Sequence, residues 1–161
     1  MSAKRWVVNA SPLILLGKIQ RLDLLEAFVP GAVVPESVIR EIGAGAELDA
    51  AAHQAVDWAR GRLVADVDLP LWVANWDLGA GESQVIAHSL LEPSVAVLDD
   101  GEARSCAQSR NIPLIGTLGI VLRARKQGMI PAARPLVEQL AAAGSFLHRS
   151  LIESALAQVG E

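Results

Sequence analysis

Short apolar runs alternate along the chain with segments of helical character, and this alternation constrains the fold more than any other feature. The runs lie at residues 6–9, 32–34, 63–67, 95–98 and 113–115. Turn- or cap-forming residues follow the runs, and the intervening stretches have the apolar spacing of helices. Strands separated by helices usually pair in parallel and are covered on both faces. The sequence therefore predicts a three-layer α/β fold with a central parallel sheet of four or five strands flanked by helices.

Caps and breakers divide the rest of the chain into helices. Ser11 supplies an N-cap hydroxyl and Pro12 a first helical residue for a helix over 13–18. Pro35 opens a helix that runs to Ile42, and Gly-rich segments end or begin others. Further helices are predicted at 22–28, 48–60, 82–91, 102–110, 117–127, 131–143 and 147–159. We expect one domain over residues 1–161, in which about 130–161 forms a helical C-terminal extension.

Composition limits the classes of function. The 161 residues are 52% apolar, which is enough to bury one full core. Fourteen Lys and Arg against eighteen Asp and Glu give a net charge of −4, so any nucleic-acid contact needs a local basic patch or a bound cation. The single Cys106 favours a reducing, cytoplasmic location. No apolar stretch approaches the roughly 20 residues of a membrane span, so no membrane partner is expected.

Polar residues follow two of the predicted strands. The run at 95–98 stops on Asp99 and Asp100, and the first run stops on Asn9. In parallel α/β sheets, polar groups at the carboxyl ends of strands converge on one cleft. On a strand the two aspartates point to opposite sides, so at most one would face the cleft fully. The other can cap the following helix, as Asp often does, and Asn9 can equally be a turn residue.

Two glutamates extend this set. The predicted apolar stripe of the helix over 82–91 is formed by Val85, Ile86 and Leu90, and Gln84 and His88 lie off it. Glu82 precedes Val85 and Ile86 by three and four residues, which places it on or beside this stripe. Glu41 follows Val38 by three residues, at the edge of the inward face of its own helix. The alternatives are helix-start electrostatics for Glu82 and an amphipathic flank position for Glu41.

Converging carboxylates repel one another unless a cation lies between them. Oxygen ligands without His or Cys suit Mg²⁺ or Mn²⁺ rather than Zn²⁺. Such an ion can lower the pKa of a water and stabilise negative charge on a phosphodiester. The pattern therefore indicates the chemistry of a metal-dependent nuclease. The candidate metal ligands are Asn9, Glu41, Glu82, Asp99 and Asp100.

Several further residues have two interpretations each. Thr117 either caps its helix or lines the cleft. Arg104 either meets a phosphate or forms a salt bridge with Asp100. Three basic residues form a cluster that is either an RNA-backbone patch or a solvated helix face: Arg123, Arg125 and Lys126.

Aromatic and histidine residues favour structural roles. Trp72 and Trp76 lie four residues apart and are expected in the core, although an exposed pair would indicate an interface. The three histidines lack metal-ligand spacing and are predicted at the surface or its edge.

As a set, these pieces resemble the PIN-domain nucleases, a family that includes the VapC-type toxins of toxin–antitoxin pairs. The likeness is closest to an uncharacterised PIN-like, nucleic-acid-binding branch, and it covers nearly the whole chain in order. The matching pieces are VVNASPLI at 7–14, VPESV at 34–38 with Glu41, GAGES at 79–83, LDD at 98–100 with Ala103 and Arg104, IGTLGI at 115–120 and AGSF at 143–146.

The resemblance implies the roles of the acids. The family's first acid falls on Asn9, the second on Glu41, the third on Glu82 and the fourth on Asp99 or Asp100. Ser11 matches a small hydroxyl residue near the first acid. The family binds one or two Mg²⁺ or Mn²⁺ ions there and cleaves single-stranded RNA. Asn9 departs from the family's Asp, and the lost charge should weaken metal binding.

The resemblance implies an endoribonuclease toxin that acts as a homodimer and is neutralised by a small antitoxin protein. A catalytically weakened PIN fold that binds RNA or a protein is the alternative. A receiver or phosphatase-like domain would carry its acid pair after the first strand, and here that strand ends in Asn9.

Overall fold

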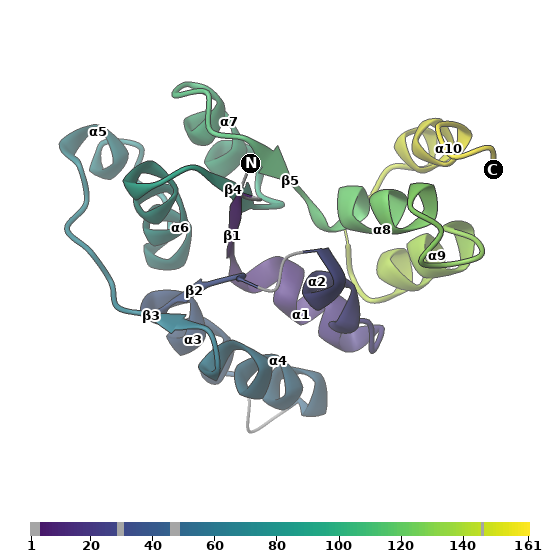
Figure 1. Ribbon diagram of the computed structural model, residues 1–161, viewed down its shortest axis with the longest axis horizontal. Helices are drawn as coiled ribbons and strands as arrows, with labels where there is room; N and C mark the ends of the chain where they lie inside the picture. Colours follow the sequence, from purple (N-terminus) through teal and green to yellow (C-terminus); the bar gives the residue numbers. More distant parts are fainter. Residues whose placement is uncertain (1–3, 29–30, 46–48, 146) are drawn as a thin grey trace.

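The computed structural model describes residues 4–28, 31–45, 49–145 and 147–161. Within them the strands are parallel and form two sheets (Figure 1). In the first, β1 (Arg5–Val8) pairs with β4 (Ser94–Val97), which pairs with β5 (Leu114–Ile115). In the second, β2 (Val34–Pro35) pairs with β3 (Leu63–Val64). An isolated parallel bridge between Val7 and Val33 joins the two sheets.

This arrangement confirms the predicted α/β fold with a parallel sheet flanked by helices. The bridge gives the strands the order β3-β2-β1-β4-β5, with β1 in the middle. The run predicted as a strand over 63–67 ends at Val64, because the next residues serve as hydrogen-bond partners for α6 (Ala80–Leu91). There the Val67 N–H donates to the Gln84 amide oxygen at 2.9 Å and not to a neighbouring strand.

The helices follow the predicted order. Their bounds are α1 Ala10–Lys18, α2 Asp23–Phe28, α3 Glu36–Gly43, α4 Ala50–Arg60, α5 Leu71–Ala74, α6 Ala80–Leu91, α7 Gly101–Gln108, α8 Thr117–Lys126, α9 Arg134–Ala142 and α10 Arg149–Ala157. The short α5 lies in the stretch for which the sequence predicted no element. Leu48 and Phe146, which fell in a predicted helix and in the last matching motif, lie outside the described residues.

The C-terminal helices lie together on one side of the sheet, at the right of Figure 1. Helix α9 starts three residues later than predicted, and Pro135 occupies its first turn. The Glu161 carboxylate accepts hydrogen bonds from the backbone amides of Ala133 and Arg134 at 2.7 and 3.0 Å. The last residue of the chain thus satisfies amides at the start of α9, which have no partner within the helix.

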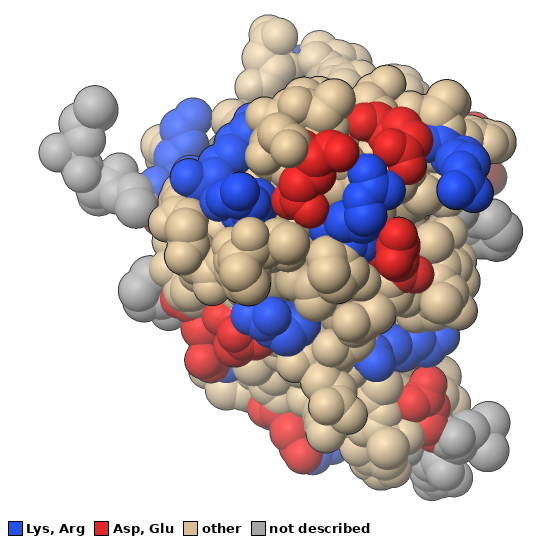
Figure 2. All heavy atoms as spheres, turned by 90° about the vertical axis from the view of Figure 1, so that its right-hand side faces the viewer, with Lys and Arg blue, Asp and Glu red and all other residues tan. Residues whose placement is uncertain are grey.

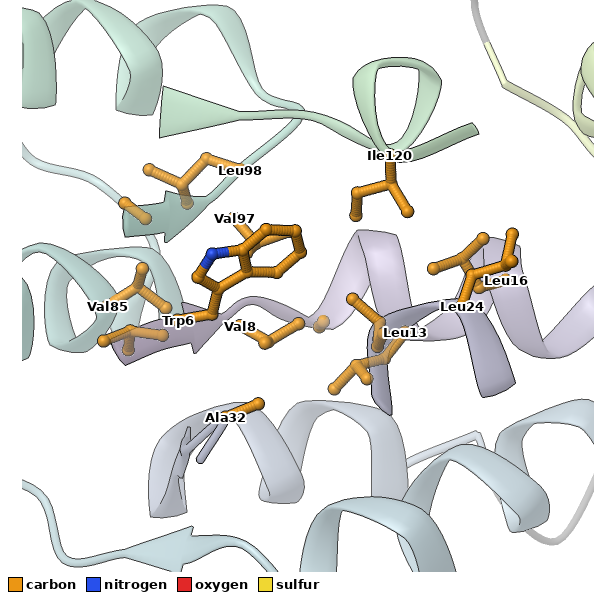
Figure 3. Close-up of a cluster of buried hydrophobic side chains, with 14 of the residues drawn as sticks. Trp6, Val8, Leu13, Leu16, Leu24, Ala32, Val85, Val97, Leu98 and Ile120 are labelled. Atoms are coloured by element: carbon orange, nitrogen blue, oxygen red, sulfur yellow. The ribbon is translucent and has the colours of Figure 1, made fainter. Parts of the chain in front are cut away.

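The core surrounds β1 (Figure 3). Val7 and Val8 are completely buried, and Trp6 is 3% exposed. Because helices cover both faces, consecutive residues of the strand are apolar instead of alternating with polar ones. Figure 3 shows Val8 on β1 and Leu13 on α1, and the register of the sheet pairs Val8 with Val97 of β4. This packing places the residue after β1, Asn9, at the edge of the core.

The structure corrects several predictions for α6. Gln84 and His88 were placed off its apolar stripe, and His88 at the surface, yet they are 7% and 4% exposed. Their side chains bond the backbone of the segment after β3: Gln84 Nε2 donates to the Val67 carbonyl, and His88 Nε2 lies 2.9 Å from the Ala65 carbonyl. Leu90, predicted on the stripe, is exposed. Neighbouring elements cover nearly every side of α6, so no single face defines its burial.

The tryptophan pair divides. Trp72 packs partly buried against the core beneath the Arg110 guanidinium, 4.2 Å from the ring centroid. Trp76 is 38% exposed, which contradicts its predicted place in the core. Helix α5 ends at Ala74, so these residues do not share one helical face.

The helices of the described residues include none with the length and apolar character that a membrane span requires.

Candidate active site at the carboxyl edge of the sheet

A cavity of about 970 Å³ opens where β1, β4 and β5 end. Seven of the residues singled out in the sequence line it: Asn9, Ser11, Glu82, Asp99, Asp100, Arg104 and Thr117. Helices α1, α6, α7 and α8 all begin near this edge, and their N-terminal amides partly offset the negative charge gathered there. Parallel pairing therefore brings together residues that are as many as 108 positions apart in the sequence.

Asp99 is the most constrained acid of the cavity. Its Oδ2 accepts hydrogen bonds from Ser11 Oγ at 3.1 Å and from Thr117 Oγ1 at 2.6 Å, and its Oδ1 accepts one from Thr117 N at 2.7 Å. Hydrogen bonds to both oxygens hold the carboxylate in one orientation. Thr117 thus lines the cleft, and Gly116 occupies the N-cap position of α8 in its place.

Asp100 caps α7. Its side chain accepts a hydrogen bond from Ala103 N at 3.0 Å, as the sequence allowed for one of the pair. Both aspartates line the cavity, and Asp100 caps α7 at the same time. Strand β4 ends at Val97, so neither side chain is bound by the alternation of a strand.

Glu82 is half-buried in the first turn of α6 and lines the cavity. Burial raises the pKa of its carboxyl above the usual value, and the negative charges of Asp100, Glu41 and Glu102 raise that pKa further. The backbone amide of Gly79 acts in the opposite direction. The side chain therefore lies within electrostatic reach of the other acids.

Replacing Glu82 with glutamine is expected to stabilise the protein at neutral pH. A carboxyl whose folded-state pKa is raised binds more protons when folded than when unfolded, so it lowers stability as the pH rises from the unfolded pKa through the folded pKa. The unfolding temperature of Glu82→Gln should exceed that of the wild type at pH 7, and the difference should shrink at pH 4. Equal differences at both pH values would contradict the raised pKa.

Glu41 reaches the site from outside the cavity. It is exposed on α3, and its Oε1 accepts a hydrogen bond from Gly81 N, at the start of α6, at 2.8 Å. It does not line the cavity, although its charge acts on Glu82. Glu41, the predicted second acid, therefore lies near Glu82, the predicted third acid, but outside the cavity that Glu82 lines.

Asn9 occupies the N-cap position of α1 but does not cap it through its side chain. The residue is 3% exposed, and its Oδ1 is buried without a hydrogen-bond partner among the described residues. A buried amide oxygen without a partner costs about 1–3 kcal/mol of stability. Because Asn9 also lines the cavity, a ligand in the cavity can supply the missing partner.

The candidate cations separate into two groups. Arg104 lines the cavity and donates from Nη1 to the Leu98 carbonyl at 2.8 Å. The salt bridge predicted between Arg104 and Asp100 is absent from the described residues. The Leu98 carbonyl, six residues before Arg104, accepts this hydrogen bond from the guanidinium.

The predicted basic cluster on α8 lies outside the cavity. Arg123 stands over the Phe28 and Trp6 rings, 5.5 and 5.8 Å from their centroids, and Arg125 pairs with Glu161 at 3.4 Å. Lys126 is exposed. Figure 2 shows that basic and acidic side chains are interspersed on the face toward the C-terminal helices. These contacts favour the solvated helix face over a single basic patch.

The donor atoms at this edge suit a hard divalent cation in chemical type. They are carboxylate oxygens and one amide oxygen, the buried and unpaired Oδ1 of Asn9, a residue that lines the cavity. The described residues contain no group of three or more Asp, Glu, His or Cys side chains that is already placed to hold a metal ion. Such a set fits Mg²⁺ or Mn²⁺, which keep several water ligands, better than an ion that needs a complete protein cage.

Sequence reasoning missed two contributors. Gly81 donates its amide to Glu41, and Gly116 lies against Asp99. Gly81 lies in the first turn of α6 and Gly116 at the N-cap of α8, each against a candidate acid. A glycine at the start of a helix was the signal in the sequence that could have identified both residues.

The fold is of the α/β class, with oxygen donors gathered at the carboxyl edge of its parallel sheet. Within that class, the family model described as a PIN domain matches residues 5–161, and the chain belongs to the PIN-domain family. PIN domains are generally nucleases that use divalent metals. A comparison with curated proteins finds none that matches this chain.

Proposed function

We propose that this protein is an Mg²⁺- or Mn²⁺-dependent endoribonuclease that hydrolyses phosphodiester bonds of single-stranded RNA. The observation that carries the proposal is the shared cavity, which combines Glu82, Asp99 and Asp100 with the orphaned oxygen of Asn9 and the guanidinium of Arg104. We further propose, from the family resemblance, that it is the toxin of a toxin–antitoxin pair, acts as a cytoplasmic homodimer and binds a small antitoxin protein.

The residues would divide the work as follows. Asn9, Glu82, Asp99 and Asp100 would hold the cation, and Glu41 would add negative charge beside Glu82. The cation would supply a water of lowered pKa and would stabilise the charge that develops on the phosphodiester. Ser11 and Thr117 hold the Asp99 carboxylate in one orientation, so little reorganisation is needed when ligands bind.

The proposal is tested by incubating the protein with single-stranded and duplex RNA of the same sequence while Mn²⁺ is titrated. Cleavage of the single strand that depends on Mn²⁺, stops with a chelator and stops in the Asp99→Asn variant would support it. Metal-independent cleavage that survives in Asp99→Asn would identify a contaminating nuclease, and no cleavage at any Mn²⁺ concentration would contradict the proposal.

Asn9 favours one alternative, a PIN fold that binds RNA or a protein with weakened catalysis. The neutral amide removes one charge from the ligand set. Calorimetric titration separates the two functions: RNA binding without Mn²⁺ binding would favour the binding module, and Mn²⁺ binding would favour the nuclease.

Arg104→Ala is expected to raise KM for RNA by roughly tenfold, because a guanidinium–phosphate pair is a strong charge-assisted contact. Mn²⁺ affinity should change little. The matched control is Arg123→Ala, which removes a cation of the predicted cluster outside the cavity. If Arg123→Ala raises KM as much as Arg104→Ala does, RNA follows the cluster on α8 rather than the cavity.

A further inference from the structure

Gly81 and Glu41 meet at the start of α6 in a contact that depends on the absence of a side chain. The Gly81 amide donates to Glu41 Oε1 at 2.8 Å. A Cβ atom at position 81 would lie 2.9 Å from Oε1, 3.0 Å from Cδ and 3.1 Å from Oε2 of Glu41. The whole carboxyl group therefore lies in the space that any other residue at position 81 would fill.

The contact has a defined electrostatic setting. Gly81 is the second residue of α6, so its amide has no partner within the helix and belongs to the positive end of the helix dipole. Among the described residues, this amide is the hydrogen-bond donor to the Glu41 carboxylate, and it binds only Oε1. The next residue along α6 is Glu82, on which the Glu41 charge acts.

A second acid is seated in the same way. A Cβ at Gly116 would lie 2.9 Å from Asp99 Oδ1, and that oxygen accepts the amide of the next residue, Thr117, at 2.7 Å. At both places a carboxylate from one element lies against the N-terminus of another helix over a glycine. The two contacts differ in freedom, because Glu41 is exposed whereas Asp99 is held by three hydrogen bonds.

We propose that Gly81 is a positioning residue, whose amide and missing side chain hold the Glu41 carboxylate beside Glu82 for cation binding. This inference rests on the proposed metal-dependent function. The backbone itself does not require glycine at position 81, because Gly81 has no positive φ. The atoms that an added Cβ would meet belong to the flexible end of the exposed Glu41 side chain. Alanine at position 81 therefore displaces the carboxylate and leaves the fold intact.

The first measurement uses neither metal nor RNA. Helical Gly→Ala changes normally raise the unfolding temperature. Gly43→Ala is the matched control, because Gly43 is helical and nothing lies within 4 Å of its added Cβ. In the wild-type background, we expect Gly81→Ala to raise the unfolding temperature less than Gly43→Ala does. In the Glu41→Ala background, we expect the two glycine substitutions to raise the unfolding temperature by equal amounts. Equal effects already in the wild type would overturn the contact.

The second measurement is Mn²⁺ binding by calorimetry. Gly81→Ala should weaken Mn²⁺ binding about tenfold, as the loss of a group beside the metal ligands usually does. Gly43→Ala should not change it. Adding Glu41→Asp to Gly81→Ala should restore part of the affinity, because the shorter side chain withdraws from the new Cβ. Unchanged Mn²⁺ affinity in Gly81→Ala would show that Glu41 only caps α6, and would overturn the positioning role.

Kinetics separate this inference from the proposed function. In single-stranded RNA cleavage, Gly81→Ala should lower kcat about tenfold with little change in KM, because the RNA contacts remain. If the wild type cleaves no RNA, the proposed function fails while the stability cycle and the Mn²⁺ titration still decide the role of Gly81. If the wild type binds no Mn²⁺, both fail.

Discussion

Replacing Asp99 with asparagine is expected to lower the RNA cleavage rate by a factor of about 10²–10³, the usual cost of losing one preorganised group that stabilises charge in the transition state. The carboxylate accepts the Thr117 amide and two hydroxyl hydrogen bonds. In asparagine, an NH₂ group replaces one of the two carboxylate oxygens. In either orientation of the amide, this NH₂ group faces the Thr117 amide or the two hydroxyl groups. The change therefore removes a charge and also disturbs the residues that hold it.

The same variant should lose about 1–3 kcal/mol of stability, the cost of a buried polar group left without a partner. Chemical denaturation with and without Mn²⁺ measures this loss, and single-turnover cleavage measures the rate. Glu138→Gln is the control, since Glu138 is exposed on α9 and does not line the cavity. An Asp99→Asn variant that is less stable but cleaves RNA at the wild-type rate would give Asp99 a structural role only.

Replacing Asn9 with aspartate is expected to have opposite effects with and without a cation. Position 9 is 3% exposed and lies in a cavity already lined by Glu82, Asp99 and Asp100. An added buried carboxylate there lacks a partner and is repelled by these acids, so the metal-free protein should unfold at a lower temperature. With Mn²⁺ bound, the same charge gains a dication at contact.

We expect Mn²⁺ to bind Asn9→Asp at least about tenfold more tightly than wild type, because even a strongly screened contact between a carboxylate and a dication contributes more than about 1.4 kcal/mol. Excess Mn²⁺ should then raise the unfolding temperature of Asn9→Asp by more than it raises that of the wild type. RNA cleavage at limiting Mn²⁺ should rise in parallel. Asn9→Ser, which removes the amide without adding charge, is the control. Unimproved Mn²⁺ binding in Asn9→Asp would show that the missing charge does not limit the site.

The sequence predicted the fold in most respects because its local patterns agree with one another. Apolar runs such as 95–98 are followed by helix starts, and a parallel sheet is the usual way to bury both. Helix α6 shows the limit of this reasoning. Burial of Gln84 and His88 depends on the backbone of residues 65–67, which supplies their partners from 17 to 23 positions away. The apolar periodicity of one helix does not predict which distant segment packs against it.

The candidate site shows the same division. The order of the chain predicted that Asn9 and Asp99 would meet, because each follows a strand of one parallel sheet. For Thr117 it left both the cleft and the helix cap open. It left open which partner each would take. Arg104 illustrates this, since spacing alone favoured Asp100 and the turn after β4 offered the Leu98 carbonyl at 2.8 Å. A side chain chooses between such partners by distances of an ångström or less, which residue spacing does not specify.

By itself, the sequence determined the α/β class, the strand ends that carry the polar residues and the absence of a charge at position 9. These follow from residue type and order, which act over a few positions of the chain. Only the tertiary structure decided that Asp99 is held by Ser11 and Thr117, that Glu41 lies outside the cavity and that Gly81 leaves room for its carboxylate. Those contacts join segments that are 18 to 88 residues apart. They exist because packing of the helices around β1 brings the separate ends together, and that packing is a property of the whole chain.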